Sequence, residues 1–314
     1  MLPQMTFDWT AALRRSRQSI GAMAEGRRAV ERAAWKRFPF GDRIYRYGGT
    51  ALRDNWNRLH LGDREPYPSP EWLDALVVAN PALQAHVGNP DDLLILLEDA
   101  WRAYHAGDFA VAVERGTAAG PLGMVVATRA AAVYAAYLEN DATRRLEILC
   151  ETVESSNALV QLAPLWANAW YVHGLALGRY SQHVSTVRTL TRGRRTGAQV
   201  RYSLQRALQL APLHSYAQAG LGIYHAEVIG KLGGVMATLS CGARRERVIE
   251  HFEEARRLHP RSALLLAEYA RSLTRAFGDE KAEVAHQLFE EAVACQPADA
   301  LERLGLEIAL AALE

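Results

Sequence analysis

Apolar positions recur along most of the chain at the spacing of an α-helix rather than that of a strand. From Ser69 onward, apolar residues return every three or four positions, and clusters of proline, glycine, asparagine or aspartate separate the runs. Ser69-Pro70 and Asn89-Pro90 each place a capping residue before a proline, which is how many helices begin. The pattern predicts an all-α protein with short connections between its helices.

Two copies of a 48-residue unit occupy residues 165–260. Three Leu-x-Pro endings mark the unit at equal intervals: Pro164, Pro212 and Pro260. Gly174 and Gly222 are separated by the same interval. A fixed period in this range is typical of helical hairpins stacked into a solenoid. Helices should therefore end just before each of these prolines, and residues 165–297 should contain no strand.

Each unit begins with a long helical pattern. Its apolar stripe continues through Leu190 in the first copy and through Leu239 in the second. We therefore expect lengthened first helices rather than irregular insertions. Glycines at 230, 233 and 234 predict a kink or break in the second copy.

The two ends of the chain differ from the middle. Residues 1–70 combine a basic amphipathic pattern over 8–37, predicted to be helical, with an aromatic and proline-rich arm. Residues 71–297 form the predicted helical array, and 298–314 a C-terminal capping helix. The arm carries too many aromatic residues for a solvated tail, so we expect residues 38–72 to pack against the array through these rings: Tyr45, Tyr47, Trp56 and Trp72.

Charge is unevenly distributed although the net charge is only +1. Residues 155–226 hold seven arginines and no acidic residue. The predicted basic patch consists of four arginines close together in the chain: Arg188, Arg192, Arg194 and Arg195. Either the acidic segments 61–154 and 246–314 neutralise this charge, or an external anion does. Because the forked guanidinium suits carboxylates and the total charge is near zero, we expect an acidic protein or peptide partner rather than nucleic acid.

Composition gives the general class. The chain is 49% hydrophobic and 23% charged, and its three cysteines form no C-x-x-C pair. The N-terminal residues lack the apolar segment of a signal peptide, and no run of about 18 apolar residues predicts a membrane span. We expect a cytoplasmic protein without cofactor or metal.

Motifs for catalysis are weak. His225-x-Glu227 is part of the zinc-deaminase pattern, but no Pro-Cys-x-x-Cys follows to complete a metal site. The other common hydrolase, metalloprotease and nucleotide-binding motifs are missing. We therefore predict a non-enzymatic protein with no catalytic residue. An enzyme that uses His225 and Glu227 is the least favoured alternative.

The repeat interval suggests which polar residues share one surface. Arg179 corresponds to Glu227 and His183 to Lys231, and neighbouring repeats place such positions about 10 Å apart. Arg179 and Glu227 should then form an ion pair, which either joins adjacent repeats or belongs to a binding site. The candidate groove residues are Asn168, Tyr171, Arg179, Gln182, His183, Tyr224, His225, Glu227 and Lys231.

Several runs resemble tetratricopeptide repeats, a family of helical hairpins. They are Gly107-Asp108-Phe109-x-x-Ala112, Trp170-x-x-His173-Gly174-x-x-Leu177 and the stretch from His251 to Pro260. Three other runs, 56–63, 177–182 and 222–229, resemble an uncharacterised family of cytosolic bacterial proteins of this kind. A weaker similarity is to the T component of periplasmic substrate-binding transporters.

The resemblance implies a right-handed superhelix of about five hairpins, in which the first helices line a concave groove. It also implies a non-enzymatic scaffold or adaptor that binds a protein or peptide in that groove. The similarity to the transporter component implies the alternative of a small-molecule carrier, with a polar pocket between the long helices.

Overall fold

A computed structural model describes residues 35–42, 45–183 and 190–314, with backbone alone for 190–194. The chain divides into two compact units, Met1–Lys36 and Arg37–Glu314, and every helix of the described residues belongs to the second. Of the helix expected over 8–37, only residues 35–37 are described, and these three are not helical. All regular elements of the described part are helices and none is a strand, so the predicted all-α class is confirmed.

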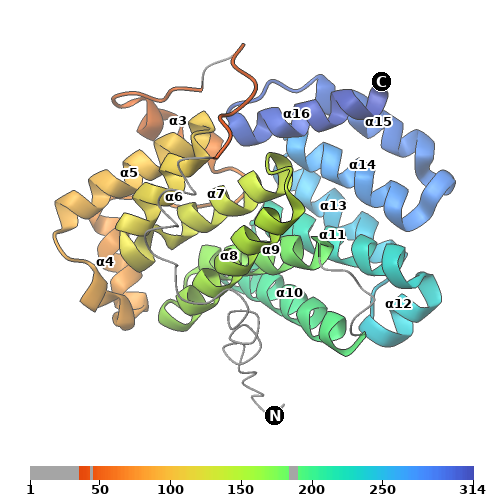
Figure 1. The fold of residues 1–314 in the computed structure, drawn as a ribbon, viewed down its shortest axis with the longest axis horizontal. Helices are drawn as coiled ribbons and strands as arrows, with labels where there is room; N and C mark the ends of the chain where they lie inside the picture. Colours follow the sequence, from red (N-terminus) through yellow and green to blue (C-terminus); the bar gives the residue numbers. More distant parts are fainter. Residues whose placement is uncertain (1–34, 43–44, 184–189) are drawn as a thin grey trace. The chain divides into compact units, whose positions relative to one another are not determined.

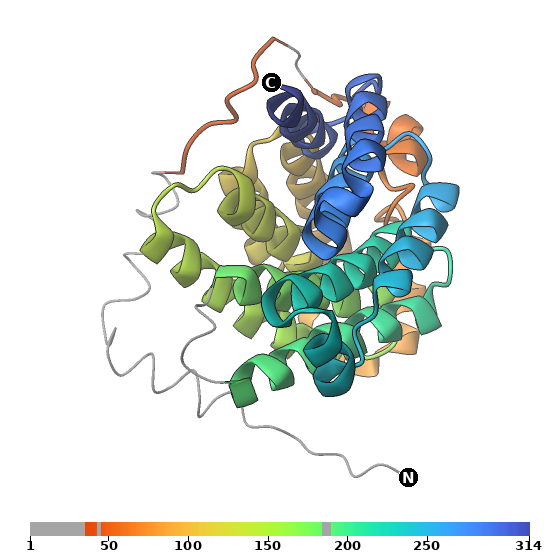
Figure 2. The ribbon, with the colours of Figure 1, turned by 90° about the vertical axis from the view of Figure 1, so that its right-hand side faces the viewer.

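Most of the helices form two layers (Figures 1 and 2). The inner layer consists of α5 (Pro90–Ala106), α7 (Met124–Tyr137), α9 (Ala167–His183), α11 (Ser215–Leu232), α14 (Ala263–Phe277) and α16 (Ala300–Leu313). The outer layer consists of α6 (Phe109–Ala118), α8 (Ala142–Leu162), α10 (Leu190–Leu210), α13 (Arg245–Leu258) and α15 (Ala282–Val293). Consecutive helices pack as hairpins, and each inner helix also packs on the next inner helix.

Shorter elements connect and flank these layers. They are α3 (Ala51–Leu59), α4 (Pro70–Ala79), α12 (Gly234–Cys241) and the 3₁₀ turns η1 (Pro81–His86), η2 (Gly120–Gly123) and η4 (Gly278–Lys281). Ser69 and Asn89 cap α4 and α5 with their side-chain oxygens, as their place before a proline predicted. None of the helices in the described ranges has the length and apolar character needed to cross a bilayer.

The 48-residue unit is visible in the packing. Helices α8, α10 and α13 each end two residues before a unit's proline, as predicted. A Cβ atom on Gly174 would lie 2.9 Å from the Leu204 side chain, and one on Gly222 would lie 2.5 Å from Phe252. Leu204 and Phe252 are themselves 48 residues apart. Each glycine therefore lets an inner helix approach the outer helix that follows it.

In the second copy the lengthened first helix is broken, as its glycines predicted. Helix α11 ends at Leu232, and Gly233 adopts a positive φ of 74° before α12 begins. A residue with a side chain rarely adopts this conformation, so the break occurs at one of the three glycines that predicted it. In the first copy, α9 ends at His183, and the 21 residues of α10 take up much of the extra length.

The arm packs against the helices. Tyr45 and Trp56 are buried and Tyr47 and Trp72 are half-buried, so the predicted packing is confirmed. After α3 the chain turns and then continues without regular structure to the start of α4, and we call residues 60–69 the strap. Backbone atoms of the strap bond to two inner helices, because the backbone N–H of Tyr216 donates to the Gly62 carbonyl and the Asn168 amide donates to that of Asp63.

The predicted C-terminal capping helix is present as α16, and it contacts α5, the first helix of the inner layer. The Asp299 carboxylate, which caps α16, lies 2.8 Å from Nδ1 of His105 on α5. The Tyr47 hydroxyl of the arm donates to the Ala298 carbonyl at 2.5 Å. The last helix of the layer is therefore bonded to the first helix and to the arm.

Candidate functional site

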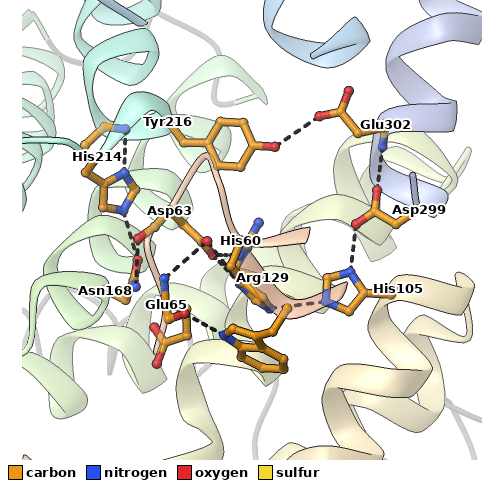
Figure 3. A network of polar contacts seen from close by, with 12 residues as sticks. His60, Asp63, Glu65, His105, Arg129, Asn168, His214, Tyr216, Asp299 and Glu302 are labelled. Carbon is orange, nitrogen blue, oxygen red and sulfur yellow. Dashed lines mark hydrogen bonds and ion pairs between the residues drawn. The ribbon is translucent and has the colours of Figure 1, made fainter. Parts of the chain in front are cut away.

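A polar cluster lies where the strap crosses the inner layer (Figure 3). At its centre the guanidinium of Arg129, on α7, forms an ion pair with the carboxylate of Asp63 on the strap. The Asp63 side chain is 0% exposed and that of Arg129 is 3% exposed. The guanidinium also lies over the rings of Tyr104, Trp101, Tyr171 and Tyr216. The cation is thus enclosed by a carboxylate and aromatic rings.

Charge and burial act in opposite directions on this pair. Burial alone would raise the pKa of Asp63, but the charge of Arg129 and the contact with His60 hold that pKa well below its ordinary range. Nδ1 of His60 lies 3.0 Å from the Asp63 carboxylate, yet burial lowers the pKa of His60 to about 4. Asp63 is therefore an anion and His60 a neutral imidazole at neutral pH.

Hydrogen bonds extend the cluster to both ends of the inner layer. Nε2 of His60 lies 3.2 Å from Nε2 of His105, which in turn contacts Asp299 through its Nδ1. On the other side, Nε2 of His214 lies 2.9 Å from Oδ1 of Asn168. We call this connected set, centred on Asp63 and Arg129, the sealed network.

Two further buried carboxyls belong to the sealed network. Glu302 accepts hydrogen bonds from the hydroxyls of Ser262 at 2.6 Å and Tyr216 at 3.1 Å. Burial, together with the nearby charge of Asp299, raises the pKa of Glu302 to about 7. Burial also raises the pKa of Glu65 to about 8, and its Oε2 has no hydrogen-bond partner among the described residues. Both groups hold a proton more readily than an exposed glutamate does.

The sealed network explains what the strap does. It fills the inner face between α5, α9 and α11 with buried residues and satisfies Arg129 from within the chain. An extended peptide could enter this part of the inner face only by displacing a desolvated ion pair, which is costly. The expected groove is therefore occupied here by the protein's own residues.

A second polar region of the inner layer is open. It is a pocket of about 220 Å³ toward the C-terminal ends of α7, α9, α11 and α14, which we call the inner pocket. Its lining consists of Ala136, Tyr137, Arg179, Gln182, His183, Ile223, Glu227, Lys231, Glu268, Arg271, Ser272 and Arg275. Four of these side chains are Arg or Lys and two are carboxylates.

One carboxylate of the inner pocket is held by α9. Nη2 of Arg179 lies 2.9 Å from Oε1 of Glu268 and 2.5 Å from the Tyr137 hydroxyl, which donates to the same carboxylate oxygen at 2.7 Å. Burial opposes ionisation of Glu268, but the charges of Arg179 and Arg271 lower its pKa to about 2. This group of three residues is a fixed, charge-balanced wall of the pocket.

The other carboxylate is Glu227. It pairs with Arg275 at 3.0 Å and more loosely with Lys231 at 3.9 Å, and it accepts a hydrogen bond from Gln182. The ion pair expected between Arg179 and Glu227 is therefore wrong. Each has a partner on α14 instead, because that inner helix supplies both Glu268 and Arg275, and Gln182 bridges Arg179 to Glu227.

Positive charge remains after these pairs are made. Arg271 is exposed at the pocket and forms no hydrogen bond or ion pair with the described residues. Lys231 also donates to the Ser181 carbonyl at the end of α9, and burial lowers its pKa. Cations near helix C-termini are stabilised by the helix dipoles, which accounts in part for their presence here. The pairing nevertheless leaves an excess of two positive charges facing the pocket.

The structure brings together five of the nine predicted groove residues. They line the inner pocket: Arg179, Gln182, His183, Glu227 and Lys231. Asn168 and Tyr171 lie instead in or beside the sealed network. Tyr224 lines a different cavity beside α12. His225 is buried and stacks on His251 at 5.7 Å, with its Nδ1 unbonded among the described residues.

The predicted basic patch is described only in part. Arg188 lies outside the described residues, and Arg192 and Arg194 are placed in α10 through their backbone alone. Arg195 is exposed on the same helix.

Sequence reasoning missed the residues that the strap and the last inner helices contribute. Asp63, Arg129 and Glu302 are far apart in the chain and fall in no repeated position. The one available signal was His60-x-Gly62-Asp63, a polar run with glycine that directly follows α3. Glu268 and Arg275 could have been placed by extending the inner-helix pattern past Pro260.

The chain matches no protein-family model and no curated protein.

Proposed function

We propose that the protein is a non-enzymatic binding protein that holds a small anionic ligand in the inner pocket. The observation that carries this proposal is the charge of the pocket, where four cationic side chains face two carboxylates. Arg271 forms no hydrogen bond or ion pair with the described residues, and its charge acts on Glu268, which Arg179 already pairs with. An anion that carries two carboxylates, or a phosphate, would balance the remaining charge. Arginine forms two parallel hydrogen bonds with either group.

The size of the pocket supports a small ligand. Its volume of about 220 Å³ is below that of most drug-sized sites, and the strap fills the neighbouring inner face. The polar walls are already arranged, because Arg179 is bonded to Glu268 and Tyr137. A ligand would therefore meet a largely preorganised site, which reduces the entropic cost of binding.

A second candidate is an acidic side chain or chain end of a protein partner. Exposure of Arg271 and Arg275 at the pocket favours it, because a macromolecule could reach both guanidinium groups from solvent. This would be the peptide-binding scaffold expected from the resemblance to tetratricopeptide repeats. We also propose that the hairpins are of that kind, supported by the left-handed Gly107 that ends α5 and by the repeated glycine contacts at Gly174 and Gly222.

The test is a thermal-shift and calorimetric screen with inorganic phosphate, succinate, citrate and a short acidic peptide. A ligand at about 100 times its Kd should stabilise the folded protein by about 2.7 kcal/mol. Arg271→Gln should weaken binding about tenfold, as expected for loss of one charge-assisted hydrogen bond. Arg257→Gln, on the outer helix α13, is the matched control and should bind like the wild type.

The outcomes separate the candidates. Stabilisation by the small anions supports the first, and stabilisation by the peptide alone supports the second. Binding that is equal in the wild type and in Arg271→Gln, or no binding by any probe, would overturn the assignment of the pocket.

A further inference from the structure

Helix α12 presents an apolar ridge to solvent. Val235 is 75% exposed, Met236 55% and Leu239 79%, which makes this eight-residue helix unlike the other described helices. The spacing of one and four positions places the three side chains on one face. The opposite face is anchored by Ala237, which is fully buried. Large apolar side chains gathered in this way are a common feature of interaction sites.

The ridge is a formed structure rather than a frayed turn. Gly233 and Gly242, both with positive φ, bound the helix at its two ends. The Thr238 hydroxyl donates to the carbonyls of Gly234 and Ala243, which ties the helix to the chain that follows it. Helix α12 also packs against α10 and α11. The exposed side chains are therefore held in place before any partner binds.

A groove runs beside the ridge. It is a cavity of about 410 Å³ between α10, α11 and α12. Its lining consists of Ala198, Arg201, Tyr224, Thr238, Leu239, Ser240, Cys241 and Gly242. Leu239 belongs to both ridge and groove. Arg201, which is half-buried, makes no hydrogen bond or ion pair with the described residues. The groove thus offers the side chain of Leu239 and the guanidinium of Arg201 to a partner, within a lining that is otherwise mostly polar.

The sequence around the ridge is positively charged. From 190 to 245 the chain holds eight Arg and Lys residues, namely Arg192, Arg194, Arg195, Arg201, Arg206, Lys231, Arg244 and Arg245, and one acid, Glu227. That acid and Lys231 both lie in the inner pocket, and Arg245 pairs with Glu280. Arg244, three residues after the end of α12, is exposed. The partner should therefore carry negative charge beside an apolar face.

We propose that the ridge and groove form a docking surface for an acidic amphipathic helix of a partner protein. The apolar face of that helix would pack on Val235, Met236 and Leu239, and its carboxylates would meet Arg201 and Arg244. Helices recognised in this way bind through side chains three and four residues apart. This surface and its partner are separate from the inner pocket and its anion.

The shape favours a helix over a lipid surface. A flat bilayer could cover the ridge but would leave the groove beside it unfilled, and Arg201 lies in the groove rather than on the ridge. A helix can place one side chain in the groove while its neighbours cover the ridge. A carboxylate side chain of the partner helix could therefore enter the groove and reach the guanidinium of Arg201.

The experiment uses the full chain and a fluorescein-labelled synthetic helix of about 18 residues, with leucines on one face and glutamates on the other. Fluorescence anisotropy should show saturable binding that weakens with salt. Leu239→Glu and Met236→Glu should each weaken it about tenfold or more, as at a binding hot spot. Val78→Glu and Ile95→Glu change equally exposed residues on α4 and α5 and should have no effect.

Charge reversal tests the electrostatic part independently. The double variant Arg201→Glu/Arg244→Glu should bind the glutamate helix about tenfold more weakly than the wild type does. It should bind a matched lysine helix more tightly by a similar factor. Vesicles with about 30% anionic lipid test the rival occupant. Vesicle binding without binding of the glutamate helix would overturn the proposal. So would ridge variants that bind that helix like the wild type.

Discussion

The sealed network and the inner pocket are built from the same inner helices but differ in what fills them. Each contains an arginine paired with a carboxylate and bordered by tyrosine. Arg129 and Asp63 are enclosed by the strap, whereas Arg179 and Glu268 border an open pocket at 14% and 9% exposure. The strap supplies Asp63 from within the chain, whereas Arg271 forms no ion pair with the described residues, because the acid whose pKa it lowers, Glu268, is paired with Arg179. A charged cluster on the inner face is part of the protein core when the chain itself supplies all of the counter-charge. It is a candidate binding site when positive charge is left over.

The energetic consequence follows from burial. Removing one member of a fully buried ion pair leaves an unpaired charge out of water, which costs several kcal/mol. At the open pocket, water can solvate whatever a substitution leaves behind, so the same change costs less. Substitutions in the sealed network should therefore mainly lower the free energy of unfolding. Substitutions in the inner pocket should mainly change ligand affinity.

The largest effect is expected from Arg129→Met. It removes the cation that pairs with the buried carboxylate of Asp63, so the free energy of unfolding should fall by about 3–5 kcal/mol, as measured by urea denaturation. Arg256→Met is the control, because its pair with Glu291 is exposed and should contribute less than about 1 kcal/mol. Equal midpoints for the two variants would contradict the assignment of the network as core.

The second prediction concerns pH. The pKa of Glu302 is about 7 in the folded protein, above the ordinary 4.5, so its proton stabilises the fold. That contribution is complete below about pH 4.5 and is lost as the pH rises through 7. Between pH 5 and pH 8 the wild type should lose about 2 kcal/mol of its free energy of unfolding through this group. Glu302→Gln stays neutral and should not show that loss.

The histidines of the sealed network change stability with pH in the opposite direction to Glu302. The measurement therefore compares the stability curve of the wild type with that of Glu302→Gln. Burial lowers the pKa values of His60 and His214 to about 4, and their contribution is therefore lost as the pH falls from about 6.5 toward 4. Because both proteins share these histidines, the difference between wild type and Glu302→Gln isolates the carboxyl. Parallel stability curves from pH 5 to pH 8 would show that Glu302 titrates normally.

An intermediate effect is expected from Glu268→Gln. Arg179 loses its carboxylate partner but keeps the Tyr137 hydroxyl and can reach water, so unfolding should become easier by about 1–3 kcal/mol. The same change raises the excess positive charge of the inner pocket, and affinity for succinate or phosphate should therefore increase. Calorimetric titration measures the second effect, and weaker anion binding by this variant would count against the proposed electrostatics.

The smallest effect on stability is expected from Arg271→Gln. The side chain is exposed and makes no ion pair with the described residues, so its removal should change the free energy of unfolding by less than about 0.5 kcal/mol. Its loss should instead appear in ligand affinity. A variant that unfolds at a clearly lower urea concentration would place Arg271 in the fold rather than in the site.

Much of the fold follows from the sequence because helical periodicity is a local property. The endings before Pro164, Pro212 and Pro260 and the break near Gly233 each depend on a few adjacent residues. The continuation of the stripe to Leu239 was misleading, because three apolar residues on α12 face solvent rather than a core. Periodicity shows which side chains share a face and leaves open what covers that face.

The site was harder to predict because its partners are distant in the chain. The repeat interval correctly grouped Arg179, Gln182 and Glu227, which lie on neighbouring inner helices. It did not supply Glu268 or Arg275, because α14 lies beyond the two matched units and the interval was not extended to it. The contact between Asp63 and Arg129 depends on how the arm folds back, which no periodic pattern encodes.

The bond between α16 and α5 has a consequence for how the protein is made. In an open solenoid each hairpin contacts its neighbours alone, so folding can begin at one end and spread. Here His105 must meet Asp299, 194 positions later in the chain. During synthesis, at roughly 5–20 residues per second, the arm and first hairpins must wait about ten seconds or more for that partner to leave the ribosome. Throughout that interval the first inner helix lacks its contact with α16, and His105 lacks the carboxylate that it meets in the finished fold.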